Sequence, residues 1–161
     1  DRIKQDAVVP VYLAGCLTMN SAGEMLAPLG SLKESGIIAA TDYPYSSADN
    51  QIFVNAIKYA SMFGLKIIEF PVDSYLTGGG MTHESPLSLK MGLRGYPRMA
   101  EELSVQRAIT ISKNLDVSIH LSSISSEGSV SLIKEAKKSG TKITADVCTN
   151  HLLLKIGRAH V

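Results

Sequence analysis

The stretch FVNAIKYASMFGLKIIEF, residues 53–70, decides the fold class of this chain. Its first part places apolar side chains at the three- and four-residue spacing of one helix face, and Gly64 then offers the left-handed conformation that ends many helices. Residues 66–70 form a short apolar run with two adjacent isoleucines, which is typical of a buried strand. The stretch therefore predicts a helix followed by a strand. The residues of the helix face are Phe53, Ala56, Ile57, Ala60 and Phe63.

Similar apolar runs recur along the chain, each after a glycine or a polar turn. None of them alternates cleanly with polar residues, and a continuous apolar strand suits a parallel sheet that is covered on both faces. Helical patterns lie between the runs, so the chain is predicted to be α/β. The predicted strands are Val8–Leu13, Ile37–Thr41, Lys66–Phe70, Val117–Leu121 and Ile143–Val147.

A helix is predicted between the first two strands. Ser21 followed by Glu24 has the spacing of a capping box, in which the hydroxyl accepts from a helical amide and the carboxylate reaches back to the cap. This helix is expected to run to about Ser35 and to stop at Gly36.

Two more helices are predicted in the second half of the chain. Residues 103–111 show a less regular apolar stripe, whereas residues 130–137 show a clear one. Ser125 or Ser126 is expected to cap the later helix and Gly140 to end it. Residues 71–98 are predicted to be irregular.

Composition narrows the classes of function. The 161 residues are 45% hydrophobic and 19% charged, which is enough apolar material for one ordinary core. Lys and Arg total 16 against 15 Asp and Glu, and they are scattered, so we expect neither nucleic acid nor a membrane as partner. Cys16 and Cys148 are isolated, and no signal-like start or apolar run of about 20 residues is present, so we expect a cytoplasmic protein.

Periodicity leaves two architectures open, a doubly wound sheet and part of a barrel. A closed eight-stranded barrel usually needs about 250 residues. Five strands are too few for it, so the barrel interpretation implies a fragment.

In either architecture the carboxyl ends of the strands form the functional rim, because the loops there converge. Polar or ionisable residues follow every predicted strand, which favours a pocket, although strand ends are also polar simply because loops are. These residues are Cys16, Thr18, Asp42, Tyr43, Glu69, Asp73, His120, Ser122, Ser123, Asp146, Thr149, Asn150 and His151.

Two chemistries are considered for this rim. Asp42, His120 and His151 are the only plausible histidine and carboxylate set for a metal ion that activates water, although His120 is also expected to be a core histidine bonded to a backbone carbonyl. Residues 77–84 form a glycine-led loop suited to a lid or an anion cradle. Neither the P-loop lysine pattern nor GxGxxG after a strand is present, so nucleotide binding is disfavoured.

Three stretches resemble one family. GGGMTHE (78–84), followed by GLRGYP (92–97) and AEE (100–102), is similar to GG-x-M-H-E-G, G-L-x-G-I-P and A-E-E of class I dihydroorotases. IHLSSISS (119–126) with the following GSV is similar to L-H-I-x-H-V-S-T-x-G-S-V, and TADVCTNHLLL (144–154) to T-A-E/D-V-T-P-H-H-L-L-L. The resemblance runs from about Val9 to Leu154.

The resemblance implies that residues 1–154 are an internal fragment of a (β/α)8 TIM-type amidohydrolase barrel, with about five parallel strands and intervening helices. The H-x-H metal pair, the substrate-binding arginine and the late catalytic aspartate of the family fall outside this chain. We therefore name no catalytic residue within it.

Inside the chain, the resemblance assigns some site positions and removes others. Phe70 and Ser123 stand where active members carry metal-binding histidines, and His120 matches an upstream histidine that is not a ligand. Asp42 keeps one aspartate of an S-D-D-G segment and is the one candidate metal ligand, whereas Tyr43 replaces the other. The predicted pocket rim comprises Asp42, His120, Ser123, Asn150 and His151.

Because phenylalanine has no lone pair and a serine hydroxyl is a poor zinc ligand, we expect no cofactor. The pattern is similar to the non-catalytic dihydroorotase-like subunits that assemble with aspartate transcarbamoylase in pyrimidine biosynthesis, so we expect that partner and a homo-oligomer. The alternative is an active zinc-dependent dihydroorotase or related cyclic amidohydrolase, which interconverts carbamoyl aspartate and dihydroorotate. A stand-alone doubly wound domain is the third hypothesis.

The last seven residues depart from the family pattern. Residues 155–161, KIGRAHV, are the translation expected of a sequencing-adapter read-through, so we predict that they are not part of the natural domain. The other interpretation is a short natural helix end.

Overall fold

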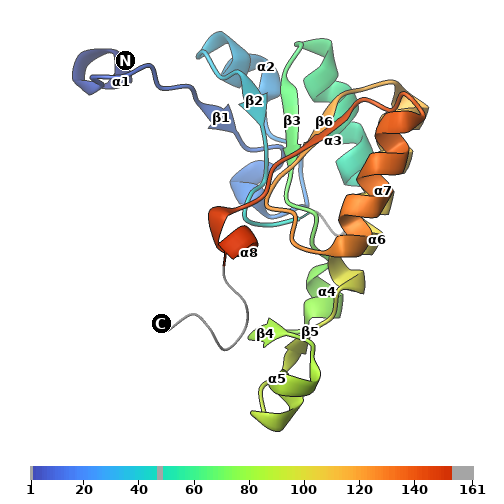
Figure 1. Ribbon diagram of the computed structural model, residues 1–161. Coiled ribbons are helices and arrows are strands. Elements are labelled where there is room, and N and C mark those ends of the chain that lie inside the picture. The colour runs from blue at the N-terminus through green and yellow to red at the C-terminus, as the bar shows by residue number, and fades with distance from the viewer. Residues whose placement is uncertain (1, 47–48, 154–161) are drawn as a thin grey trace.

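A computed structural model describes residues 2–46 and 49–153 of the chain (Figure 1). Its main element is a five-stranded parallel sheet in the order β1-β2-β3-β6-β7. These strands are β1 (Ala14–Gly15), β2 (Ala39–Ala40), β3 (Lys66–Glu69), β6 (Ile119–Leu121) and β7 (Ile143–Ala145). The helices are α1 (Arg2–Asp6), α2 (Leu29–Glu34), α3 (Asn50–Met62), α4 (Ser74–Thr77), α5 (Pro86–Lys90), α6 (Met99–Leu115), α7 (Glu127–Lys138) and α8 (Thr149–Leu153), with a 3-10 turn at Met19–Ser21.

The strand order distinguishes the two architectures that periodicity left open. Along the main sheet the strands follow one another in chain order, and the order never reverses. A doubly wound sheet reverses its order at a switch point, whereas a barrel does not. The five strands of the main sheet are therefore adjacent strands of a barrel, as predicted.

Helices cover one face of this sheet. In Figure 1, α3, α6 and α7 lie along the same side of the strands. Ile67, Ile119 and Leu121 point into that layer and are fully buried, whereas their neighbours Ile68 and His120 are only partly buried. Within the part of the chain described, the second face has no helix layer, which agrees with its being the inner wall of a barrel, where side chains fill the interior.

Local signals placed α3 and α7 correctly. Asp49 caps α3, since its Oδ1 accepts from the amides of Gln51 and Ile52 at 2.7 and 3.1 Å. Gly64 follows α3 with φ +63°, as predicted. Ser126 caps α7, and its hydroxyl accepts from the amide of Ser129.

The predicted helix between the first two strands is wrong in its first half. Ser21 has a φ of +54° and its hydroxyl donates to Cys16 Sγ, so it caps nothing. Helix α2 begins only at Leu29, after Pro28. The antiparallel bridge between Thr18 and Leu26 folds the intervening residues into a tight loop, which competes with the helix.

The first predicted strand is displaced. Residues 8–13 have no strand structure, and their large apolar side chains are exposed, whereas β1 begins at Ala14. The apolar run predicted a buried strand, but no segment within the described residues covers these side chains.

Residues 71–98, predicted to be irregular, leave the main sheet and return to it through short elements. We call this segment the excursion. Beside α4 and α5, strands β4 (Thr82–His83) and β5 (Gly95–Tyr96) pair in parallel as a small second sheet. The amide of Asp73 donates to the carbonyl of Ala100 at 2.9 Å, so the two ends of the excursion meet. Figure 1 shows the excursion beyond the carboxyl ends of the main strands, on the same side as α8.

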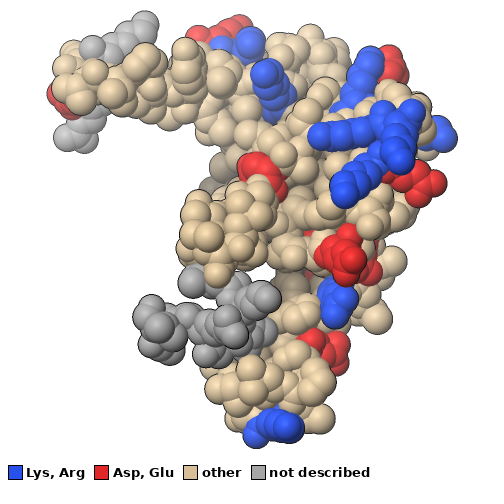
Figure 2. All heavy atoms as spheres, in the orientation of Figure 1, with Lys and Arg blue, Asp and Glu red and all other residues tan. Residues whose placement is uncertain are grey.

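Basic side chains are less scattered than the sequence suggested. Lys134, Lys137 and Lys138 are exposed on α7, and Figure 2 shows blue side chains gathered over that helix with acidic ones beside them. None of the described helices is long and apolar enough to cross a membrane. The predicted adapter-derived tail, 155–161, lies outside the described residues.

Candidate functional site

The carboxyl ends of the main strands carry the predicted rim, and Asp42 is one of its buried members. It follows β2 and is 4% exposed. Its Oδ1 accepts from the amides of Leu17 and Thr18 at 2.9 and 3.0 Å, and its Oδ2 accepts from the Thr18 hydroxyl at 2.7 Å. Both oxygens are thus used to hold the loop after β1. Its role as a metal ligand stays a prediction.

Glu69, at the end of β3, is buried on the helix side of the sheet. Its Oε1 accepts from Arg107 Nη2 and from the Ser46 hydroxyl, each at 2.8 Å. Arg107 also lies over the Phe53 ring, 4.8 Å from the centroid. Burial raises the pKa of Glu69 to about 7, and the opposing effect of Arg107 and Ser46 only partly offsets it.

This pKa predicts how the stability of the full-length protein depends on pH. A folded pKa above the ordinary value of 4.5 means that the folded state holds the proton more tightly than the unfolded state. The stabilisation is therefore complete below about pH 4.5 and is lost as the pH rises through 7. We expect this group to contribute a decline on the order of 3 kcal/mol in the free energy of unfolding between these limits.

Chemical denaturation across pH 5 to 8 tests this expectation. Glu69→Gln keeps the packing and one acceptor oxygen but does not titrate, so it should flatten the decline, whereas Glu135→Gln on the exposed face of α7 should leave it unchanged. An unchanged slope in Glu69→Gln would assign the pH dependence to other groups.

Phe70 follows Glu69 and lies at the position where the resemblance places a metal-binding histidine. Its ring packs edge-on against Tyr43, with centroids 5.0 Å apart and planes at 68°. Tyr43 follows β2, so the contact joins the ends of two adjacent strands. Aromatic pairs of this geometry are favourable beyond the area that they bury.

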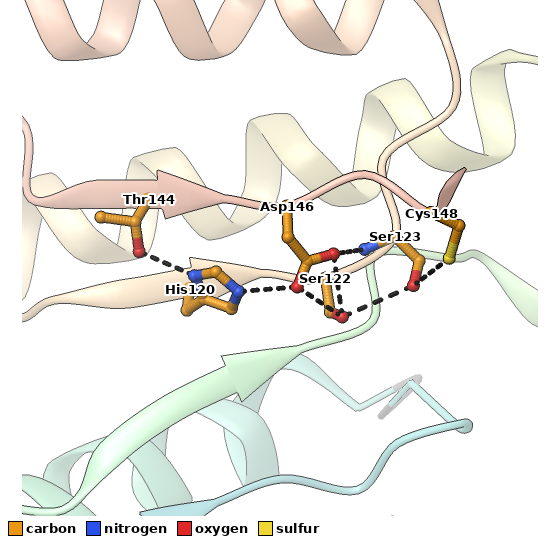
Figure 3. Close-up of polar contacts among 6 residues, drawn as sticks. All are labelled: His120, Ser122, Ser123, Thr144, Asp146 and Cys148. Carbon is orange, nitrogen blue, oxygen red and sulfur yellow. Dashed lines mark hydrogen bonds and ion pairs between the residues drawn. The ribbon is translucent and has the colours of Figure 1, made fainter. Parts of the chain in front are cut away.

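A polar network joins the ends of β6 and β7 (Figure 3). The carboxylate of Asp146 accepts from His120 Nε2 at 3.0 Å, from the Ser122 hydroxyl at 3.2 Å and from the Ser123 amide at 2.6 Å. His120 Nδ1 lies 2.8 Å from the Thr144 hydroxyl. His120 therefore contacts side chains, and the expected bond to a backbone carbonyl is not among its contacts.

The surroundings of Asp146 stabilise its charge. Partial burial raises the pKa of this carboxyl, but the hydrogen bonds from His120, the Ser123 amide and Ser122 outweigh burial, and the pKa is lowered. Because a carboxylate only accepts, Nε2 of His120 carries a proton.

Ser123 has an unusual backbone conformation in this network. Its φ is +64°, in the left-handed region that side chains other than glycine rarely adopt. The hydrogen bond from its amide to Asp146 holds that conformation, and its hydroxyl accepts from Cys148 Sγ at 3.3 Å. The residue that stands in place of a histidine is thus held by two residues from the β7 end, through its amide by Asp146 and through its hydroxyl by Cys148.

A cavity of about 610 Å³ opens beside these strand ends. Ser123 and His151 of the predicted rim line it, together with Phe70 and residues of the excursion between β3 and α6. Asn150 is exposed on α8, beside His151. The wall mixes aromatic and polar groups; the lining residues that the excursion and its end contribute are Gly80, Met81, Thr82, His83, Tyr96 and Arg98.

The donor groups do not converge on a metal site. Within residues 2–46 and 49–153, no three His, Cys, Asp or Glu side chains come together as a metal-binding group. The set Asp42, His120 and His151 does not form one, since Asp42 faces the β1 loop and His120 faces Asp146. These three residues therefore do not form a zinc site together in the described part of the chain.

Sequence reasoning missed Glu101 in the first turn of α6. It is buried, and its carboxylate accepts from the Ser125 and Ser126 amides and the Ser125 hydroxyl at the start of α7. Burial raises its pKa, yet these hydrogen bonds and that of Ser129 lower it further than burial raises it. A glutamate beside an alanine at a helix start gave only a weak signal, because surface acids are common there.

The fold and rim define the class, an amidohydrolase-type barrel, and solved structures agree. The chain superposes on the L-hydantoinase (dihydropyrimidinase) of Arthrobacter aurescens with a TM-score of 0.70 at 12% identity, covering 92% of this chain and 34% of that one. It superposes on the D-hydantoinase of Bacillus sp. AR9 with a TM-score of 0.68 at 19% identity, covering 93% and 34%. At these identities the likeness concerns the fold alone.

Sequence comparison gives the family. A family model described as dihydro-orotase-like matches residues 1–129, and the chain belongs to this family. It is 37% identical over 154 residues to a dihydroorotase of Acetivibrio thermocellus, covering 96% of this chain and 36% of that protein. It is 38% identical over 146 residues to a dihydroorotase of Pelotomaculum thermopropionicum, covering 91% and 34%. The chain thus spans about a third of these relatives.

Proposed function

We propose that the protein containing this chain is a non-catalytic dihydroorotase-like subunit of pyrimidine biosynthesis that assembles with aspartate transcarbamoylase. The observation that carries the proposal is the chemistry at the two positions matching metal-binding histidines. Phe70 offers no lone pair there, and Ser123 offers a hydroxyl that already accepts from Cys148. A zinc centre that activates water needs imidazole, carboxylate or thiolate ligands with a coordination position left for water, and neither phenylalanine nor a serine hydroxyl supplies one.

The remaining carboxylate supports the same conclusion. Turning the Asp42 carboxylate away from Leu17 and Thr18 toward a metal ion would leave two buried amides unsatisfied. A buried donor without a partner costs about 1–3 kcal/mol.

The partner and the homo-oligomer follow from the family resemblance. A barrel that keeps its fold without its metal ligands retains surfaces on which other subunits can assemble. The family motifs at 78–84 and 92–97 lie within the excursion, whose residues line the cavity together with His151.

A second function is an active dihydroorotase. The identity of 37–38% to curated dihydroorotases favours it. In that case residues outside this chain would supply the metal ligands, and the substrate would be carbamoyl aspartate or dihydroorotate.

Metal content and turnover of the full-length protein distinguish the two functions. We expect sub-stoichiometric zinc and no hydrolysis of dihydroorotate, because the ligand positions hold Phe70 and Ser123. The dihydroorotase of Acetivibrio thermocellus, purified and assayed in parallel, controls for the loading and assay conditions.

Co-expression tests the assembly. The transcarbamoylase from the same source should co-elute with the full-length protein in size-exclusion chromatography. Stoichiometric zinc with turnover would instead establish the enzyme, and separate elution in the absence of turnover would remove the proposed partner.

A further inference from the structure

Neighbouring strand ends of the main sheet are linked at the rim, through side chains in three of the four pairs and through the backbone in the fourth. At the β1 and β2 ends, the Thr18 hydroxyl donates to Asp42 at 2.7 Å across a sequence separation of 24 residues. Asp42 is buried, so this contact is shielded from water. The first two strands are therefore joined by a hydrogen-bonded carboxylate.

The next link is apolar. Tyr43 and Phe70 meet edge-on at 5.0 Å and join the β2 end to the β3 end. Both lie at positions where the family resemblance places polar, metal-associated side chains. If Phe70 had replaced a histidine while an aspartate remained at position 43, that carboxylate would face a ring. The two substitutions are complementary, because together they exchange a charged contact for an aromatic one.

The links continue to the last described strand. The Ser122 amide donates to the Glu69 carbonyl at 2.8 Å, which joins the β3 end to the β6 end. The Ser123 amide then donates to Asp146 at 2.6 Å and joins the β6 end to the β7 end (Figure 3). Every adjacent pair of described strands is thus connected at its carboxyl end.

We infer that these contacts form a rim belt that holds the strand ends together without a metal ion. The belt is defined by the side chains of Thr18, Asp42, Tyr43, Phe70 and Asp146 and by the backbone at Glu69, Ser122 and Ser123. It rests on the proposed function in one respect, since a non-catalytic rim has no bound metal to cross-link its strands. The structural claim is separate: the aromatic pair and the Asp146 hydrogen bonds cross-link the strand ends, as a bound metal ion would in a metal centre.

Hydrogen–deuterium exchange of the full-length protein measures this cross-linking. In the wild type, exchange of the peptides covering residues 41–46, 70–73 and 122–124 should be the same with and without EDTA. Losing the aromatic contact in Tyr43→Leu/Phe70→Leu should speed exchange in the first two peptides by about 2- to 10-fold, the range expected for an edge-on pair. Each single variant should produce nearly the whole effect, because either substitution breaks the pair.

The chain offers a matched control pair. Tyr59 and Phe63 also meet edge-on, with centroids 5.3 Å apart and planes at 76°, but they lie at the end of α3 away from the rim. Tyr59→Leu/Phe63→Leu should speed exchange near residues 59–63 and leave the rim peptides unchanged. It calibrates what the loss of one such pair does to local opening.

The outcomes separate the belt from the proposed function. Faster rim exchange on adding EDTA to the wild type would overturn the belt, a measurement that needs no variant to fold. Equal rim exchange in the wild type and in both leucine pairs would also overturn it, even if the protein holds no zinc. If the protein binds zinc and turns over substrate while its rim exchange rates are unchanged by EDTA, the belt is supported and the non-catalytic function is overturned.

Discussion

Glu101→Ala should lower the free energy of unfolding of the full-length protein by about 2–4 kcal/mol, as measured by chemical denaturation at pH 7. The carboxylate satisfies the first two amides before α7, those of Ser125 and Ser126, and lies buried between α6 and α7. Alanine would leave these donors unpaired in a site that excludes water. It would also remove a negative charge from the positive end of the α7 dipole.

Two further variants test the cause of this loss. Glu101→Gln keeps acceptor oxygen but not charge, so its loss should be smaller. Because the folded pKa of Glu101 is lowered, the stabilisation by its charge is present above the unfolded pKa and disappears as the pH falls through the folded value. The difference between wild type and Glu101→Gln should therefore shrink in acid. Glu135→Ala, exposed on α7, should change stability by less than about 0.5 kcal/mol. Equal effects at 101 and 135 would refute the capping role.

Phe53→Ala should cost about 3–5 kcal/mol in the same measurement. Phe53 is 1% exposed and packs at the centre of the layer between α3 and the sheet. Its ring also lies under the Arg107 guanidinium, which pairs with Glu69. Truncation would open a cavity and remove this support from a buried ion pair.

Phe53→Leu separates these two contributions. Leucine fills much of the volume but has no ring for Arg107, so we expect a loss of about 1–2 kcal/mol. If the pH dependence assigned to Glu69 changes in Phe53→Leu, the ring acts through Arg107. A loss in Phe53→Ala below 1 kcal/mol would mean that the site collapses around the missing ring.

The fold was predictable where a local signal agreed with the packing. The stripe over 53–63 with Gly64, and the Ser126 cap of α7, became helices because their apolar faces meet the sheet. Residues 8–13 carry an equally apolar run, but a strand also needs a partner, and the run itself says nothing of one. Ser21 failed for a related reason, because the bridge between Thr18 and Leu26 imposed a loop on a sequence suited to a helix.

The candidate site was predictable as a set of positions but not as a set of contacts. Parallel strands bring their carboxyl ends together, so a rim containing Asp42, His120 and Ser123 followed from strand positions alone. The pairing of Asp42 with Thr18, and of Glu69 with Arg107, joins residues 24 and 38 positions apart. Such pairs depend on the register between elements, which periodicity does not encode.

The meeting of Asp73 and Ala100 has a consequence for how the protein can diverge. The segment from β3 to α6 leaves the barrel and returns to nearly the same point, so its interior can lengthen, shorten or be exchanged while the strand and helix that flank it keep their spacing. Closing a longer loop adds little entropic cost, about 0.6 kcal/mol per doubling. Insertions and new side chains should therefore accumulate in this segment faster than in the sheet, and one barrel can acquire different rim specificities by changing a single loop.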